Sequence, residues 1–267
     1  MMELKRLIVW IALAIYILWV LFPIYWAINS SLKYVWEVNA IPPLWWPPKP
    51  TLKNYIWALF SERAGKSLLN SLIVSTGSTA IAVFLGALAG YYFSRYRMHE
   101  GIFWWLLTTR MFPPIIFAIP IFLMFKYMGI LDTHLALIIA YVAVNIPLAV
   151  WLMRGYFDEV PVEVEEAARL DGLTPFKVIW KITMPIIAPG VAATIALTWI
   201  FAWNEFLLAY VLTRNVAFTY PVVLPTEVVS SQVFYNRMTA LSIVALLPSI
   251  IILLVFRKHI VRMYVLR

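Results

Sequence analysis

The side chains best suited to hold a small polar molecule cluster near residue 205, where Asn204 and Glu205 follow Trp199 and Trp203 in otherwise apolar sequence. Sugars bind through hydrogen bonds to their hydroxyl groups and through aromatic rings under their apolar faces, and this cluster offers both. The same residues could instead hydrogen-bond a neighbouring helix beside tryptophans at a membrane surface. The sequence does not support a catalytic role, because the three histidines lack zinc-ligand spacing and the chain has no cysteine.

Two further polar residues stand in apolar surroundings. Arg110 precedes Pro113 and Pro114, which should kink a helix, so this arginine either anchors a neighbouring helix or lines a pathway. Asn145 lies two residues before Pro147, and we expect it to satisfy carbonyl groups freed by the proline more readily than to touch a substrate.

The elements that must position these residues are membrane helices. The chain of 267 residues is 63% hydrophobic and only 13% charged, which excludes an ordinary soluble domain. Six stretches are long enough to cross a hydrocarbon core and hold only two charged residues, Arg110 and Glu205. Their apolar runs are continuous, so they predict helices and not barrel strands. The expected fold is an all-α membrane protein, one domain over 1–267, with transmembrane helices at 7–28, 68–93, 102–125, 134–153, 186–213 and 238–256.

Basic residues predict the orientation of this domain. One set of segments outside the spans contains 12 Lys and Arg in 57 residues, and the alternate set contains 8 in 71 residues. The first set is 1–6, 94–101, 154–185 and 257–267, and the second is 29–67, 126–133 and 214–237. The denser set should face the cytoplasm, and with it both termini. The first apolar run is expected to be an anchor and not a removable signal peptide. No loop carries the basic cluster with interleaved aromatics that nucleic-acid binding would need.

The segment 29–67 is predicted to be an irregular outer loop, because five prolines surround Trp45 and Trp46. These tryptophans, with Trp36 and Trp57, suit the headgroup level of a membrane better than a ligand platform.

The longest inner loop, 154–185, holds six of the 13 acidic residues and is too long merely to connect two helices. A short helix is predicted from Pro161 at its first position to a stop at Gly172. A second helix should begin at Thr174-Pro175 and close at Pro185. The two helices should form an exposed lever between spans four and five.

The loop contains Glu166-Ala167-Ala168, then Gly172 after three residues, and Ile182-Thr-Met-Pro185 after nine more. This spacing resembles the EAA loop of binding-protein-dependent ABC importer permeases. Only Met184 departs from the family pattern, where leucine stands. The type I importer permease fold, with a cytoplasmic coupling helix between helices 4 and 5, is what the resemblance implies.

Further segments resemble the carbohydrate branch of that family, in particular the smaller permease subunit of maltose and trehalose importers. They are Pro50–Tyr55, Thr109–Pro114, Gly129–Thr133, Asn145–Pro147 with Trp151–Gly155, and Trp203–Phe206. The tail 257–267 lacks the glycine-rich ending of several such subunits.

The resemblance implies that this chain is a non-catalytic half of a sugar pathway in a prokaryotic cell membrane. Its partners would be a second permease subunit, two ATP-binding cassette subunits, an extracytoplasmic solute-binding protein and membrane lipid, with no nucleic acid. No Gly-x-x-x-x-Gly-Lys-Ser/Thr loop is present, so ATP and Mg²⁺ belong to the partner ATPase, and no cofactor or metal is expected here. The alternatives are a permease for a non-sugar solute, such as a polyol or glycerol phosphate, and a self-contained secondary transporter. The residues expected to couple to the ATPase are Glu165, Glu166, Ala167, Ala168, Leu170, Asp171, Gly172, Pro175, Ile182 and Pro185, and the candidate pathway residues are Arg110, Asn145, Trp203, Asn204 and Glu205.

Overall fold

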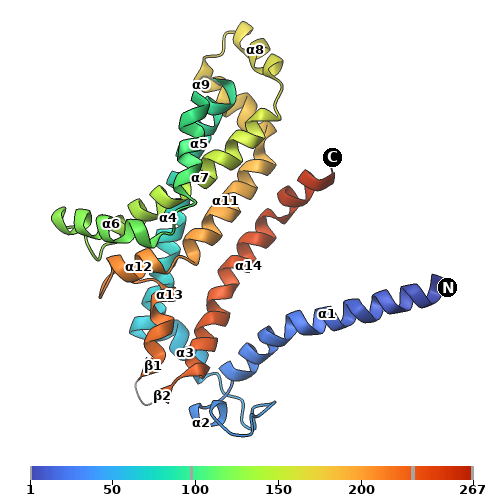
Figure 1. The fold of residues 1–267 in the computed structure, drawn as a ribbon, viewed down its shortest axis with the longest axis vertical. Coiled ribbons are helices and arrows are strands. Elements are labelled where there is room, and N and C mark those ends of the chain that lie inside the picture. Colours follow the sequence, from blue (N-terminus) through green and yellow to red (C-terminus); the bar gives the residue numbers. More distant parts are fainter. Residues whose placement is uncertain (1, 97–98, 230–231, 266–267) are drawn as a thin grey trace. The chain divides into compact units, whose positions relative to one another are not determined.

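The computed structural model describes residues 2–96, 99–229 and 232–265, and helices dominate it (Figure 1). The longer helices are α1 (Met2–Ser31), α4 (Glu62–Arg95), α5 (Glu100–Thr109), α6 (Ile115–Tyr127), α7 (His134–Asp158), α11 (Ala188–Trp203) and α14 (Tyr235–Val265). The shorter helices are α2 (Val35–Val38), α3 (Lys53–Phe60), α8 (Val162–Leu170), α9 (Pro175–Val178), η2 (Ile179–Thr183), α10 (Met184–Ile186), α12 (Leu207–Leu212), α13 (Tyr220–Val223) and η3 (Leu224–Glu227). In the described residues, the strands are β1 (Val228–Val229) and β2 (Gln232–Val233), which pair antiparallel with Val228 opposite Val233.

Four described helices are individually long and apolar enough to cross a membrane, over Arg6–Ser31, Glu62–Arg95, His134–Asp158 and Tyr235–Arg257. A fifth crossing is available if Pro175–Ile186 and Ala188–Trp203, which meet at 84°, act as one bent span. Four of the expected spans therefore coincide with continuous helices, and two do not.

The prediction of a continuous helix over 102–125 is wrong. Helix α5 ends at Thr109, and α6 begins at Ile115 after an irregular stretch. Pro113 and Pro114 lie in this break, where they donate no backbone hydrogen bond and disfavour helical geometry in the residue before each of them. The sequence signalled a kink, and the structure has a full interruption.

The prediction of one helix over 186–213 is also wrong, because α11 ends at Trp203 and α12 starts only at Leu207. Glu205 accounts for the new start, since its carboxylate accepts the backbone N–H groups of Leu208 and Ala209 at 3.0–3.2 Å. These are amides that the first turn of a helix leaves without partners.

The segment between α7 and α11 departs from its predicted boundaries in three places. Helix α7 runs on to Asp158, so the connection is shorter than 154–185. Pro161 is the N-cap of α8 and not its first helical residue. The chain passes Pro185 in helical form through η2, a π-helix, and α10, and turns only at Ile187. Pro185 donates no backbone hydrogen bond to the turn before it, which is the π-helix η2.

Two predictions for this segment are confirmed. Gly172 follows α8 with a φ of +86°, a conformation that glycine adopts at little cost and that stops a helix. Helix α9 begins at Pro175 with Thr174 as its N-cap residue.

The structure divides into two units. The first comprises Met1–Leu68 and Val223–Leu247. The prediction of an irregular loop over 29–67 holds around the prolines, between α2 and α3, but is wrong for the rest, because α2, α3 and the start of α4 are helical. The polar centre of the first unit is the buried Asn54, which donates to the carbonyls of Ser31 at 2.8 Å and Lys33 at 2.9 Å and accepts from Asn236 at 2.9 Å. This side chain holds the loop after α1 to the start of α14.

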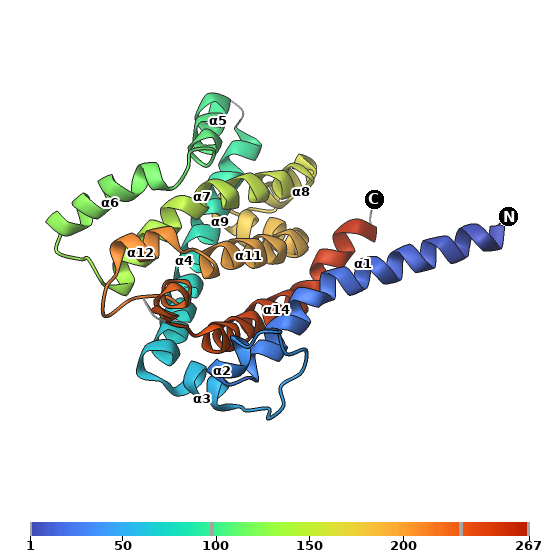
Figure 2. The same cartoon turned by 60° about the horizontal axis from the view of Figure 1, so that its bottom comes forward.

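The second unit comprises Leu69–Val222 and Pro248–Arg267 and packs α4, α7 and α11 together (Figures 1 and 2). Gly86 and Gly90 of α4, four residues apart, face the backbone of α7. A Cβ atom on Gly86 would lie 2.6 Å from the Cβ of Ala149, and one on Gly90 would lie 2.8 Å from the backbone nitrogen of Arg154. Such spacing of small residues lets membrane helices approach closely.

Asp132 joins two loops of the second unit. Its carboxylate accepts backbone N–H groups from Arg214, Asn215, Val216 and Ala217 at 2.9–3.1 Å. Burial alone would raise the pKa of this carboxyl, but the four donors lower it below its ordinary value. The loop before α7 is thus tied to the loop after α12.

Candidate functional site

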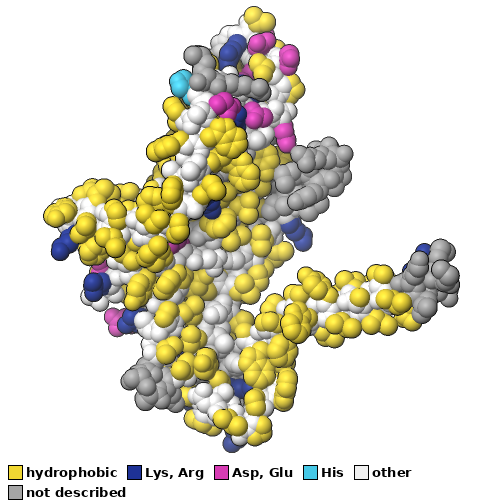
Figure 3. Space-filling view, viewed as in Figure 1, with side chains coloured by type: hydrophobic (Ala, Val, Ile, Leu, Met, Phe, Trp, Pro, Cys, Tyr) yellow, Lys and Arg dark blue, Asp and Glu magenta, His cyan; other side chains and the backbone are white. Residues whose placement is uncertain are grey.

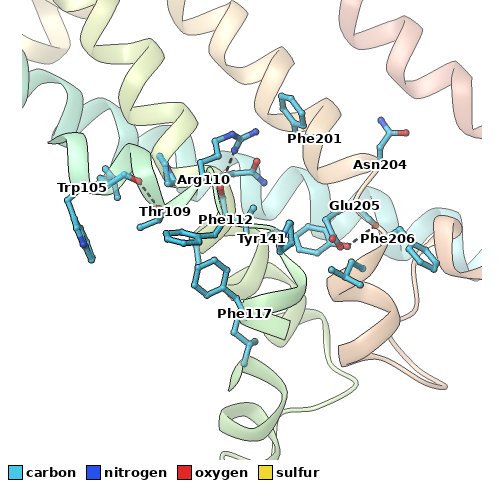
Figure 4. A pocket seen from close by; sticks show the side chains of 18 residues that line it. Trp105, Thr109, Arg110, Phe112, Phe117, Tyr141, Phe201, Asn204, Glu205 and Phe206 are labelled. Atoms are coloured by element: carbon cyan, nitrogen blue, oxygen red, sulfur yellow. Dashed lines mark hydrogen bonds between the residues drawn. The ribbon is translucent and has the colours of Figure 1, made fainter. Parts of the chain in front are cut away.

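A pocket of about 710 Å³ lies in the second unit between α5, α6, α7 and the break after α11 (Figure 4). Both interrupted helices contribute to it, because Arg110 follows the end of α5 and Glu205 follows the end of α11. Four of the five candidate pathway residues line it. They are Arg110, Asn145, Asn204 and Glu205.

Aromatic rings form much of the wall of this pocket. Its volume lies within the usual range for small-molecule sites, and its lining is mostly apolar with a few polar groups, as in such sites. The aromatic lining residues are Trp105, Phe112, Phe117, Tyr141, Phe201 and Phe206.

Arg110 is held by its own chain and keeps donors to spare. Its guanidinium donates to the carbonyl of Val144 at 3.1 Å and lies 4.8 Å from the ring centre of Phe201. Within the described part of the chain no acidic side chain pairs with it. A guanidinium has five N–H donors, so most of those of Arg110 remain available to a molecule in the pocket or to another chain.

Asn204 and Glu205 are partly occupied by structural contacts. The Asn204 amide donates to the carbonyl of Ile200 at 2.9 Å, and its oxygen accepts from the hydroxyl of Tyr220 at 2.8 Å. Glu205 caps α12, and its backbone carbonyl accepts from Tyr141 at 3.3 Å. Figure 4 shows the Glu205 carboxylate close to the Tyr141 ring in the pocket.

Trp203 does not line the pocket. It is 2% exposed, stacks on Trp199 with ring centres 4.8 Å apart, and lies near the ring of Tyr220. The structure therefore separates this tryptophan from the polar pair that follows it in sequence.

The residues predicted to couple to the ATPase lie on two faces of α8 and in the segment after it. Glu165 and Ala168 are buried at 1% and 7% exposure, whereas Glu166 and Ala167 are exposed. Leu170 is 89% exposed and Phe176 of α9 is 62% exposed, which places apolar side chains on the outside of a charged segment. Figure 3 shows acidic and basic side chains gathered around α8.

The remaining motif residues belong to the frame of the segment. Asp171 is the C-cap of α8, Pro175 begins α9, Ile182 is half-buried in η2, and Pro185 is exposed in α10.

The buried Glu165 is an ionised group in the interior. Burial alone would raise the pKa of its carboxyl, but hydrogen bonds from Arg95, Tyr91 and Thr183 lower that pKa below its ordinary value. Sequence reasoning missed these partners and Tyr141. A usable signal existed for two of them, since Tyr91 and Arg95 stand four residues apart at the end of an apolar span and so share one helix face. Tyr141 stands in apolar sequence with no such signal.

Comparison with known proteins identifies the class of this helical membrane protein. The family described as binding-protein-dependent transport system inner membrane component matches residues 82–264. The chain is 34% identical over 257 residues to the inner membrane ABC transporter permease protein YcjP of Escherichia coli K12, covering 93% of this chain and 90% of that protein. It is also 34% identical over 249 residues to the trehalose transport system permease protein SugB of Mycobacterium tuberculosis, covering 90% and 89%.

A solved structure shares the fold. The chain superimposes with a TM-score of 0.79 and 23% identity on a chain of a bacterial ABC transporter involved in the import of the acidic polysaccharide alginate, covering 97% of each chain. The protein described here belongs to the binding-protein-dependent transport system inner membrane component family. It is a multi-pass permease of a prokaryotic plasma membrane, as its apolar helices and relatives show.

Proposed function

We propose that this chain is one of two permease subunits of an ATP-driven importer for a di- or oligosaccharide such as maltose or trehalose. An aromatic-walled pocket between two interrupted helices, in a chain 34% identical to a trehalose permease, supports this proposal. Other relatives are named for diacetylchitobiose and sulfoquinovosyl glycerol, which are also carbohydrates. Family membership argues against a self-contained secondary transporter.

In this proposal the chain crosses the membrane six times with both termini in the cytoplasm. The third crossing consists of α5 and α6, interrupted at Arg110, and the fifth includes α11 and α12. The density of basic residues over 1–6, 94–101, 154–185 and 257–267 supports this orientation.

The pocket would form this subunit's wall of the sugar pathway. Aromatic side chains suit the apolar faces of sugar rings, and spare donors on Arg110 suit their hydroxyl oxygens. Asn145 and the Asn204–Glu205 pair would add polar contacts. Irregular backbone at membrane depth is tolerated where it lines such a cavity, which accounts for both helix breaks.

Helix α8 would be the coupling helix seated in a cleft of the ATPase. Its exposed side offers Glu166 for an ionic contact, Ala167 for close backbone approach and Leu170 for apolar burial. An apolar side chain as exposed as that of Leu170 gains free energy when a partner covers it. The ATPase subunits would hold ATP and Mg²⁺, and a solute-binding protein would deliver the sugar.

The mechanism is alternating access. Closure of two ATPase subunits on ATP would bring the two coupling helices of the permease pair together. Spans three to six would then change from an inward-open to an outward-open arrangement.

Purification of the tagged chain from membranes in mild detergent tests the proposal. We expect a second permease and an ATPase to co-purify, and the reconstituted complex to hydrolyse ATP faster with its binding protein and one disaccharide of a panel. Recovery of this chain alone would refute the proposal.

Gly172→Asp provides a sharper variant for the same assay. An aspartate at a φ of +86° is strained although the space beside Gly172 is open, so the turn after α8 should change while membrane insertion is retained. Sugar-stimulated ATPase activity should be lost. Normal stimulation in the purified variant complex would contradict the role given to α8.

A further inference from the structure

The carboxylate of Glu165 joins three elements at one point. It accepts the hydroxyl of Tyr91 at 2.7 Å, the guanidinium of Arg95 at 2.7 and 3.1 Å, and the hydroxyl of Thr183 at 3.2 Å. Tyr91 and Arg95 belong to α4 and Thr183 to η2, whereas Glu165 belongs to α8. The side chains of Glu165 and Arg95 are 1% and 9% exposed, so water weakens this ion pair little.

The last turn of α4 also holds the connection that leads into α8. Ser94 donates to the carboxylate of Asp158 at 2.6 Å, at the end of α7. Arg95 donates to the carbonyl of Val160 at 3.2 Å, just before α8. One turn of α4 therefore fixes the end of α7, the start of the loop and the inward face of α8.

Glu165 is out of reach of a partner chain in this arrangement. The neighbouring acids Glu163 and Glu166 are exposed on α8, and Glu166 is the carboxylate assigned to an ionic contact with the ATPase. An ionised group buried among several donors from its own chain holds its neighbours in one geometry, because leaving any of them unpaired is costly.

We propose that Glu165 is a positioning residue that, through Arg95, ties α8 rigidly to α4. This inference rests on the proposed function. When the ATPase moves α8, the tie makes α4 move with it, and the motion enters the membrane part of the protein through α4 as well as through η2 and α11. Without the tie, α8 would follow the ATPase while its loop bends at Gly172.

The test compares Glu165→Gln with Glu163→Gln in the purified transporter complex. Both variants remove one negative charge from α8, but only the first removes the ion pair with Arg95. Four quantities are measured: co-elution of the ATPase, basal ATPase activity, activity stimulated by the disaccharide-loaded binding protein, and sugar transported per ATP in proteoliposomes. Arg95→Lys, which keeps the charge and loses the planar fork, is a second way to weaken the tie.

We expect Glu165→Gln to retain the ATPase subunits and basal hydrolysis, while sugar transported per ATP falls roughly tenfold. Arg95→Lys should change the same ratio in the same direction, and Glu163→Gln should match the wild type. A merely structural role would instead reduce the amount of assembled complex and leave the ratio unchanged.

Two outcomes overturn the inference. One is an unchanged transport ratio in an assembled Glu165→Gln or Arg95→Lys complex. The other is loss of the ATPase from both variants, which would place Glu165 in docking or folding. Failure of the proposed function is distinguishable, because the wild-type complex would then show no sugar-stimulated ATPase activity at all.

Discussion

Replacing Gly86 by alanine tests the close packing of α4 on α7. The new Cβ would lie 2.6 Å from the Cβ of Ala149, 3.0 Å from its carbonyl carbon and 3.2 Å from the nitrogen of Val150. Carbon atoms in contact prefer about 3.5–4.0 Å, so the helices must separate by roughly 1 Å. Two of the three atoms are backbone, and no change of side-chain rotamer relieves them. Overpacking of this kind costs about 1–3 kcal/mol.

Gly155→Ala in α7 is the matched control, because a Cβ there meets no atom within 4 Å. Both substitutions gain about 1 kcal/mol of helix propensity, so their difference isolates the steric cost. Unfolding of the purified protein by titrated SDS, followed by tryptophan fluorescence, measures that difference. We expect Gly86→Ala to be less stable than Gly155→Ala by about 1–3 kcal/mol. Equal stability would refute the backbone contact between α4 and α7.

Two other predictions concern polar side chains that hold loops in place. Asp132→Asn should lower the thermal midpoint of the purified protein at pH 7, because an amide has one acceptor oxygen for the four N–H groups that the carboxylate binds. After allowance for solvent screening, we expect the free energy of unfolding to fall by about 1–2 kcal/mol. The pKa of Asp132 is lowered by folding, so its stabilisation is present above the unfolded pKa near 4 and is lost as the pH falls through the folded pKa. The gap between variant and wild type should therefore close as the pH falls below about 4, and a constant gap would contradict the assignment. Asn54→Ala removes three hydrogen bonds and should lower the free energy of unfolding by about 2–3 kcal/mol. The control Asn39→Ala removes one exposed hydrogen bond and should lower it by under about 1 kcal/mol in the same thermal assay. Similar losses in the two variants would contradict the role of Asn54 as the polar centre of the first unit.

Periodicity and composition predicted the long helices well, because a membrane crossing needs a continuous apolar run and little else. They failed at the two breaks. A run such as 186–213 is apolar throughout, and nothing in its hydropathy shows that Glu205 will bind the amides of a new helix instead of a distant partner. Whether a polar residue in an apolar run continues a helix or caps the next one depends on contacts that composition does not contain.

For the candidate sites too, the sequence predicted position along the chain but not the contacts made in the fold. Motif spacing located α8. Glu165 and Glu166 are adjacent in sequence, but only the packing of α8 shows that the first is buried and the second exposed. Proximity in sequence likewise placed Trp203 with Asn204, yet the helix turns the tryptophan into the interior and away from the pocket. Two partners of Glu165, Tyr91 and Arg95, lie 74 and 70 residues away in the chain, so they could be identified only from the packing of α4 against α8.

The buried Arg95–Glu165 pair restricts how this protein can change during evolution. A substitution that removes one of the two charges leaves the other charge buried without its partner, which lowers the stability of the protein. Joint replacement by two neutral side chains avoids that state. Among homologous permeases the two positions should therefore vary together and not independently, and descendants that lost one charge should have lost the other.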